Sequence, residues 1–303
     1  MDRVLLKGAL AELFDEGAAR FDASMAELTT FRIGGPADVL VEPRTAGEAR
    51  VVLEACRRLG VAVRVMGLGS DVLVADEGLR CVVVRIAESL SQVEVDGERM
   101  HVEAGASNAD VARRACEEGL AGYEFACGIP GTVGGALRMN AGSRDEWIGS
   151  RVVSVTTLSP GKGLVRRDGD QIAWGYRSSW FASDEVIVEC ELSVEPADPF
   201  FIRGKMEASH ARRKKTQPLS LPSCGSVFRN PEGAPVGALI EEAGLKGLRI
   251  GGGQGSEGHA NFIVNTGDAT ARDVLELINL VKTKVYETYG IELQPEVRFL
   301  GFA

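Results

Sequence analysis

Residues 127–142 read Cys127-Gly-Ile-Pro-Gly-Thr-Val-Gly-Gly-Ala-Leu-Arg-Met-Asn-Ala-Gly142, and glycine fills five of these sixteen positions. Glycine lets backbone N–H groups approach an anion or a flat ring with no Cβ in the way. Successive N–H groups in such a loop form a concavity that suits phosphate. A loop that merely packs against a sheet would explain one such stretch equally well.

A second glycine turn, Gly67-Leu-Gly-Ser-Asp71, directly follows the strand-like run Val61–Met66. Two glycine turns, each beside an apolar run, predict a large ligand with a pyrophosphate and a planar ring. A nicotinamide-binding Rossmann site is disfavoured, because Val72 replaces the third glycine of G-x-G-x-x-G. Residues 88–200 also carry mostly antiparallel strand signal rather than alternating strands and helices.

Composition narrows the class of protein further. The chain has 303 residues, 37 of them glycine where average usage predicts about 21, and a net charge of −9. This charge argues against a nucleic-acid partner. The six cysteines form no CxxC pair, which favours reduced thiols over disulfides or zinc. Without a signal peptide or a long apolar run, we expect a cytoplasmic protein with no membrane insertion.

Periodicity gives a coarse map of the elements. Apolar spacing predicts helices over 2–19, 46–59, 109–118, 201–215, 236–243 and 271–288. Thr45 and Asn108 are the predicted N-caps of the second and third helices. Strands are predicted over 37–41, 61–66, 72–74 and 81–86, then at 93–96 and 100–103 as a hairpin, and finally at 260–265 and 292–300. The basic helix at 201–215 could be no more than a solvated face.

Seven motifs, taken together and in this order, resemble the MurB family of UDP-N-acetylenolpyruvoylglucosamine reductases. They are Thr30-Phe-Arg-Ile-Gly-Gly35, Gly67-x-Gly-Ser70, Gly128-Ile-Pro-Gly-Thr-x-Gly-Gly-Ala136 with Met139-Asn-Ala-Gly142, Tyr176-Arg-Ser-Ser179, Gly225-Ser-Val-Phe-Arg-Asn-Pro231, Ser256-Glu-Gly-His-Ala-Asn-Phe-Ile-Val-Asn265 and Pro295-Glu-Val-Arg-Phe299. The resemblance covers residues 28–301 and is nearest to the type II form.

The resemblance implies an α+β fold: a two-lobed FAD-binding fold of the vanillyl-alcohol-oxidase (PCMH) type with a C-terminal α+β substrate-binding domain. The domains would be residues 1–87 for the first lobe, joined by the strand at 293–303, then 88–200 for the second lobe and 201–292 for the substrate domain. It also implies non-covalent FAD, NADPH as co-substrate and a UDP-sugar as substrate, and we expect a monomer.

The resemblance assigns site residues position by position. Ser226 would be the proton donor, Arg177 would hold charge on the substrate, and Glu296 would orient groups or act as an acid. The residues expected to contact FAD are Gly67, Gly69, Ser70, Asp71, Gly128, Thr132, Gly134, Gly135 and Ala136. Those expected to contact substrate are Tyr176, Lys214, Asn230 and His259. No metal is implied.

Each assignment has a simpler alternative. Ser226 could be a turn former, Arg177 a structural ion-pair partner, Glu296 a surface charge and His259 a structural histidine. Asp71 departs from the family's asparagine, so it turns away from the pyrophosphate or weakens FAD binding. Gly258 departs from the family's lysine, which removes one expected basic contact.

Two other functions fit the same fold. A flavin-dependent alcohol or sugar oxidase would often attach FAD through a histidine near a glycine loop, but His101, His210 and His259 lie outside both glycine turns. A non-catalytic nucleotide-sugar sensor would be expected to lack the three catalytic residues, and this chain has all three.

Overall fold

The computed structural model describes residue 8 and residues 19–143 and 146–302. The chain divides into two compact units. Unit 1 contains Val39–Leu68 and Cys81–Arg212 with the described residues up to Phe21, and unit 2 contains Asp22–Asp38, Gly69–Arg80 and Arg213–Ala303. The chain therefore crosses between the units several times, and each unit is described by itself.

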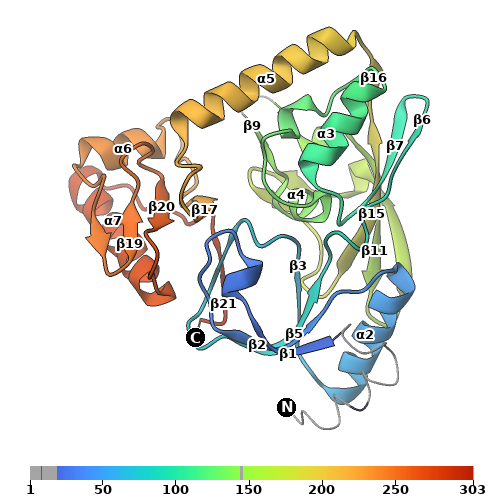
Figure 1. Ribbon diagram of the computed structural model, residues 1–303, viewed down its shortest axis with the longest axis horizontal. Helices are drawn as coiled ribbons and strands as arrows, with labels where there is room; N and C mark the ends of the chain where they lie inside the picture. The colour runs from blue at the N-terminus through green and yellow to red at the C-terminus, as the bar shows by residue number, and fades with distance from the viewer. Residues whose placement is uncertain (1–7, 9–18, 144–145, 303) are drawn as a thin grey trace. The chain divides into compact units, whose positions relative to one another are not determined.

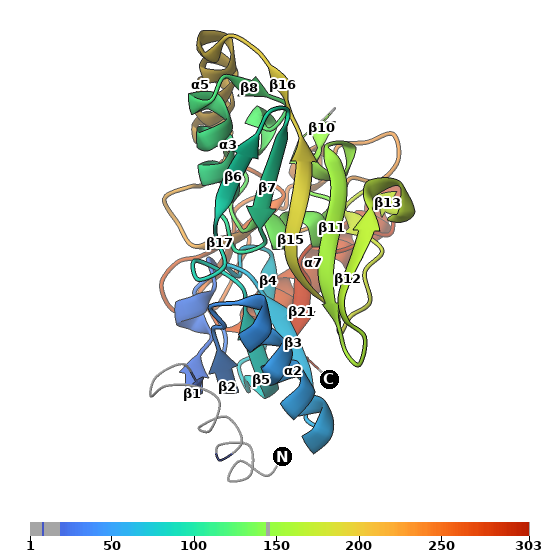
Figure 2. The same ribbon diagram turned by 90° about the vertical axis from the view of Figure 1, so that its right-hand side faces the viewer.

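Unit 1 is built on an antiparallel sheet of order β12-β11-β15-β7-β6 (Figure 2). Its strands are β6 (Val93–Asp96), β7 (Arg99–Glu103), β11 (Val152–Ser159), β12 (Gly163–Asp168) and β15 (Val186–Ser193). The register between β11 and β15 shifts at two points, which marks β-bulges. Valine is the most frequent residue in these strands, as expected for a pleated surface with one buried face.

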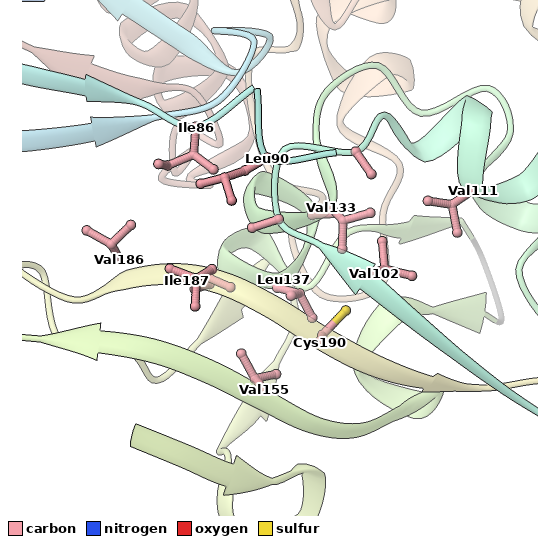
Figure 3. Packing of buried hydrophobic residues seen from close by; sticks show 14 of the residues in the cluster. Ile86, Leu90, Val102, Val111, Val133, Leu137, Val155, Val186, Ile187 and Cys190 are labelled. Atoms are coloured by element: carbon pink, nitrogen blue, oxygen red, sulfur yellow. The ribbon is translucent and has the colours of Figure 1, made fainter. Parts of the chain in front are cut away.

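Helices pack around the core of unit 1, and α4 (Val133–Met139) contacts β7 and β15 of this sheet. The helices are α2 (Ala46–Leu59), α3 (Asn108–Glu117), α4 and the part of α5 (Pro199–Thr216) up to Arg212. Figure 3 shows Val133 and Leu137 of α4 among Val102, Ile187 and Cys190 of the sheet. Both α4 side chains are fully buried, so this short helix is held by packing.

A second sheet has the order β1-β2-β5-β3, with β1 (Ala19–Ser24), β2 (Pro36–Val41), β3 (Val63–Met66) and β5 (Leu79–Arg85). Strands β3 and β5 are parallel. The helix α2 that precedes β3 begins where Thr45 accepts a hydrogen bond from the Glu48 N–H, and it ends at Gly60, whose φ is 65°. Glycine tolerates this left-handed conformation.

Unit 2 combines a sheet of order β17-β20-β19-β18 with two helices (Figure 1). These elements are β17 (Ser223–Ser226), β18 (Arg249–Ile250), β19 (Gly253–Gly255), β20 (Phe262–Asn265), α6 (Val236–Glu242) and α7 (Ala271–Tyr289). The strand β21 (Arg298–Leu300) lies parallel to β4 (Val72–Val74). Unit 2 thus unites the end of the chain with segments from its first eighty residues.

The remaining elements are short. They are β8 (Leu120–Ala121), β9 (Gly142–Ser143), β10 (Glu146–Trp147), β13 (Trp174–Gly175), β14 (Ser178–Ser179), β16 (Glu195–Pro196) and the 3₁₀ turns η1 (Ala26–Leu28), η2 (Glu124–Ala126), η3 (Ile148–Ser150) and η4 (Gly169–Gln171).

Most of the predicted elements are confirmed, with three differences. Ser107, not Asn108, caps α3: its hydroxyl accepts from the Asp110 N–H, while the Asn108 side chain is buried. The final strand is limited to β21, and the glycine stretch contains the helix α4. Of the predicted helix over 2–19, only Gly8 and Ala19 are among the described residues: Gly8 is helical, as predicted, whereas Ala19 begins β1. Within residues 19–143 and 146–302 we find no helix with the length and apolar character needed to cross a bilayer.

Candidate active site

The first glycine turn presents a row of open hydrogen-bond donors. Among the described residues, no hydrogen bond uses the backbone N–H of Gly67, Leu68 or Gly69. Gly69 has a φ of 64°, and a Cβ there would lie 2.5 Å from the Leu28 carbonyl oxygen. The turn therefore requires glycine at this position, and its consecutive N–H groups suit an anion.

The second glycine stretch divides into open and occupied donors. The N–H of Gly134 donates to the Ala104 carbonyl at 2.8 Å, that of Gly135 to the Thr132 hydroxyl at 3.3 Å, and that of Ala136 to the Thr132 carbonyl at 2.9 Å. These three residues could thus approach a ligand closely but not donate from the backbone. The N–H groups of Gly128, Gly131 and Thr132 make no hydrogen bond within the described part of the chain.

The two glycine turns meet within unit 1. A Cβ added at Gly67 would overlap the hydroxyl oxygen of Thr132. The loop before Thr132 is fixed by the buried Asn108, whose amide donates to the Ile129 and Gly131 carbonyls. Tyr123 donates in turn to the Asn108 side-chain oxygen at 2.8 Å. Open donors from two distant parts of the sequence are therefore adjacent.

Arg177 lies in a strained hairpin turn. Tyr176 and Arg177 are the two residues between β13 and β14, and Arg177 has a φ of 53°. For a residue other than glycine this conformation costs roughly 1 kcal/mol or more. The Arg177 guanidinium lies 5.2 Å from the centre of the Tyr176 ring. A non-glycine residue keeps such a conformation only where its surroundings enforce it, and such residues cluster at functional sites.

The hairpin is attached to the glycine stretch. Asn140, which follows α4 as its C-cap in a left-handed conformation, donates from its amide to the Gly175 carbonyl at 2.9 Å. The Ser179 hydroxyl donates to the Arg138 carbonyl at 2.9 Å. Arg177 is therefore held within unit 1 at the end of the helix that the glycine stretch begins.

Ser226 ends the bulged strand β17 in unit 2. Ser223 pairs with Val264 and Ser226 with Phe262, so β17 has one more residue than β20 between the two pairs. Gly225 within this bulge has a φ of 79°. Bulges change the direction of a side chain and are frequent beside active sites.

Glu296 lies beside this strand. Its N–H donates to the Val227 carbonyl at 2.7 Å, and the Arg229 N–H donates to the Gln294 carbonyl at 2.9 Å. The segments that carry Ser226 and Glu296 are thus antiparallel neighbours. Burial raises the pKa of the Cys224 thiol, and the nearby carboxylates of Asp71 and Glu296 raise it further.

The predicted substrate contacts in unit 2 have different surroundings. His259 contacts the Phe262 ring edge to face, with ring centres 4.6 Å apart. Burial lowers the pKa of His259, and its Nδ1 atom is buried without a hydrogen-bond partner among the described residues. The Asn230 oxygen accepts from the Val236 N–H at 3.0 Å, which orders the loop before α6. Lys214 is exposed near the end of α5.

The structure therefore groups the predicted site residues by unit. Unit 1 contains Gly67, the residues from Gly128 to Ala136, Tyr176 and Arg177. Unit 2 contains Gly69, Ser70, Asp71, Lys214, Ser226, Asn230, His259 and Glu296. Sequence reasoning missed the supporting roles of Asn108 and Asn140, because an asparagine beside a turn gives no sign of its distant partners.

Two family models match separate parts of the chain, and named reductases match nearly all of it. Residues 217–300 match the C-terminal domain of UDP-N-acetylenolpyruvoylglucosamine reductase, and residues 37–169 match an FAD binding domain. The reductase of Alkaliphilus oremlandii is 41% identical over 99% of both chains, and that of Halalkalibacterium halodurans is 42% identical over 94% of this chain and 95% of its own.

Solved structures agree. The MurB reductase from Thermus caldophilus has a TM-score of 0.81 at 33% identity, covering 93% of this chain and 98% of its own. Phl p 4.0202, a glucose dehydrogenase, has a TM-score of 0.52 at 17% identity, which shows a shared fold over 65% of this chain and 44% of its own. The predicted α+β fold with an FAD-binding domain is confirmed. This chain belongs to the UDP-N-acetylenolpyruvoylglucosamine reductase family.

Proposed function

We propose that this chain reduces UDP-N-acetylglucosamine enolpyruvate to UDP-N-acetylmuramate with NADPH, using non-covalent FAD, in peptidoglycan precursor synthesis. The identity of 41% to a reductase of that name over 99% of both chains supports the activity. The observation in the structure that carries the proposal is the meeting of two glycine turns at Gly67 and Thr132, each with open N–H donors.

The donor set fits a dinucleotide. The open N–H groups of Gly67, Gly128 and Thr132, all in unit 1, suit a pyrophosphate. Gly69 and Ser70, the next residues along the first glycine turn, are proposed as further contacts. Gly134, Gly135 and Ala136 would serve by close approach, since their N–H groups are occupied. When bound, FAD supplies the two-electron chemistry that links NADPH to the substrate. The Asp71 carboxylate lies near β17, where it raises the pKa of the Cys224 thiol.

The net reaction adds one hydride and one proton across the carbon–carbon double bond of the enolpyruvyl ether, while NADPH becomes NADP⁺. Ser226 would deliver the proton from its hydroxyl. Glu296, on the segment beside β17, would support that transfer as an orienting group or an acid. Arg177 would bind the carboxylate of the substrate and stabilise the negative charge that develops next to it.

Four further residues would bind the substrate. Tyr176 is 53% exposed beside Arg177, and Lys214 offers a cation for the diphosphate. His259 has an unpartnered Nδ1 that can accept or donate one hydrogen bond. Asn230 would contribute its side-chain amide, whose oxygen also orders the loop before α6. The three-domain division given above, the type II form, a monomeric state and a cytoplasmic location belong to the same proposal.

The test uses the purified chain. A yellow protein whose flavin is released on denaturation, is bleached by NADPH without oxygen and recovers its absorbance on adding the enolpyruvyl substrate would support the proposal. Recovery with oxygen, after reduction by a simple alcohol or sugar, would instead indicate an oxidase. Binding of the UDP-sugar without recovery of the absorbance would indicate a sensor.

A further inference from the structure

The motif Thr30-Phe-Arg-Ile-Gly-Gly35 has no part in the proposed chemistry, yet it lies against the first glycine turn within unit 2. The Thr30 N–H donates to the Gly69 carbonyl at 3.1 Å. The Leu28 carbonyl and the Thr29 backbone lie so close to Gly69 that a side chain there would collide with them. The motif therefore supports the glycine turn by direct backbone contact.

The Thr30 side chain reaches a third part of the chain. Its hydroxyl donates to the Ser223 carbonyl at 2.7 Å, and the Gly69 carbonyl is a weaker acceptor at 3.5 Å. Ser223 begins β17, and Ser226 ends it. One threonine thus joins the turn that holds Gly69 to the strand that carries the predicted proton donor.

The loop around Thr30 is itself fixed. Asn265, on the strand β20 that pairs with β17, donates from its amide to the Phe31 carbonyl at 3.1 Å and to the Arg32 carbonyl at 3.3 Å. Arg32 has a φ of 55°, a conformation that a non-glycine residue keeps only where its surroundings enforce it. The Thr29 hydroxyl donates within the loop to the Ile33 carbonyl at 3.2 Å. Thr30 is therefore part of a rigid connection.

We propose that Thr30 is a positioning residue, which sets the distance between the cofactor turn at Gly69 and the proton donor Ser226. The inference rests on the proposed function, because it assigns the proton transfer to Ser226. Loss of the Thr30 hydroxyl would free β17 to shift relative to the turn. The proton transfer would suffer, whereas reduction of the flavin by NADPH, which does not need Ser226, would continue.

The kinetic test compares Thr30→Val, which removes the hydroxyl at nearly constant volume, with Thr30→Ser, which keeps it. Stopped-flow absorbance would follow bleaching by NADPH and recovery with the enolpyruvyl substrate separately. A 1 Å misplacement of reacting groups can slow a reaction roughly 100-fold. Loss of one hydrogen bond should shift β17 by less than that, so we expect Thr30→Val to slow recovery about tenfold. Bleaching should stay within about twofold of the wild-type rate, and Thr30→Ser should restore recovery. Thr30→Ala gives the same comparison if valine prevents folding.

The matched control is Thr29→Val, which removes the neighbouring hydroxyl from the same loop but no bond to β17. It should leave the ratio of the two rates unchanged. Hydrogen exchange of the apoprotein gives a readout without catalysis. Thr30→Val should accelerate exchange in peptides covering both 67–74 and 223–228, and Thr29→Val should do so only around 28–35.

The outcomes separate the two proposals. If the wild type shows no recovery with the enolpyruvyl substrate, the proposed function fails and this inference fails with it. If the wild type recovers and Thr30→Val matches it in both rates, only the inference fails. Equal slowing of both rates, without rescue by Thr30→Ser, would reduce Thr30 to an ordinary structural residue and would also overturn the inference.

Discussion

The contact between Gly67 and Thr132 allows a prediction about both stability and cofactor binding. In Gly67→Ala, the new methyl group would overlap the Thr132 hydroxyl. That hydroxyl caps α4 by accepting from the Gly135 N–H at 3.3 Å, so it cannot move without losing the cap. The φ of Gly67 is not positive, and alanine therefore introduces no backbone strain of its own. The whole cost should come from one side chain.

The magnitude follows from these contacts. A lost cap costs about 1 kcal/mol, and overpacking adds about 1–2 kcal/mol, so Gly67→Ala should destabilise the apoprotein by roughly 2–3 kcal/mol. Thr132→Ala should cost about 1 kcal/mol. In the double variant the nearest atom to the new methyl is the residue 132 Cβ at 3.4 Å, an ordinary contact. The double variant should therefore be no less stable than Thr132→Ala. This corresponds to a coupling free energy of roughly 2–3 kcal/mol between the two substitutions.

Urea unfolding of the wild-type, Gly67→Ala, Thr132→Ala and double-variant apoproteins measures the four free energies of unfolding. Quenching of flavin fluorescence measures the FAD affinity of the same four proteins. We expect Gly67→Ala to weaken FAD binding at least tenfold and Thr132→Ala in combination to recover part of that loss. Additive free energies of unfolding would show that the two residues do not touch in solution. Unchanged FAD affinity in all variants would show that the meeting point of the turns is not the cofactor site.

Three further predictions concern the chemistry and its pH dependence. Ser226→Ala should leave bleaching by NADPH nearly intact and slow recovery by the enolpyruvyl substrate by roughly 10²–10⁴-fold, and equal rates in both half-reactions would exclude Ser226 as the proton donor. Arg177→Gly should relieve the positive φ and raise the unfolding free energy by about 1 kcal/mol while kcat/KM for the substrate falls; a loss of stability would contradict the strain. Because burial holds the pKa of His259 below its usual 6.5, the folded state resists protonation, so stability should fall as pH drops below about 6.5. His259→Gln should flatten that part of the stability profile measured by urea unfolding, and an identical profile would refute this assignment.

The helix boundaries were largely predictable because they depend on local signals. The predicted N-cap Thr45 and the predicted end at Leu59 are both confirmed for α2. The choice between Ser107 and Asn108 was not predictable, since either residue caps helices well. It is decided by Tyr123, which hydrogen-bonds the Asn108 side chain in the interior. Helix α4 was missed because two of its seven residues are glycine, and its stability comes from the burial of Val133 and Leu137.

The candidate site was predictable as a set of residues but not as a geometry. The resemblance named Ser226 and Glu296, whereas the pairing of their segments depends on the hydrogen bond from the Glu296 N–H to the Val227 carbonyl, between residues far apart in sequence. The glycines of the stretch 127–142 were expected to donate as a group. Their N–H groups instead divide between open and occupied, because the start of α4 uses those of Gly135 and Ala136 internally.

Unit 2 is made of three stretches that lie far apart in the sequence, and this has a consequence for folding during synthesis on the ribosome. Asp76 accepts from the N–H groups of Ala271 and Arg272 at the start of α7, and Asn265 holds Phe31. Phe31 and Asp76 therefore cannot form these hydrogen bonds until partners synthesised some two hundred codons later have emerged. Contacts so distant in sequence slow folding, and the nascent segment 22–38 lacks its Asn265 contact until translation is nearly complete.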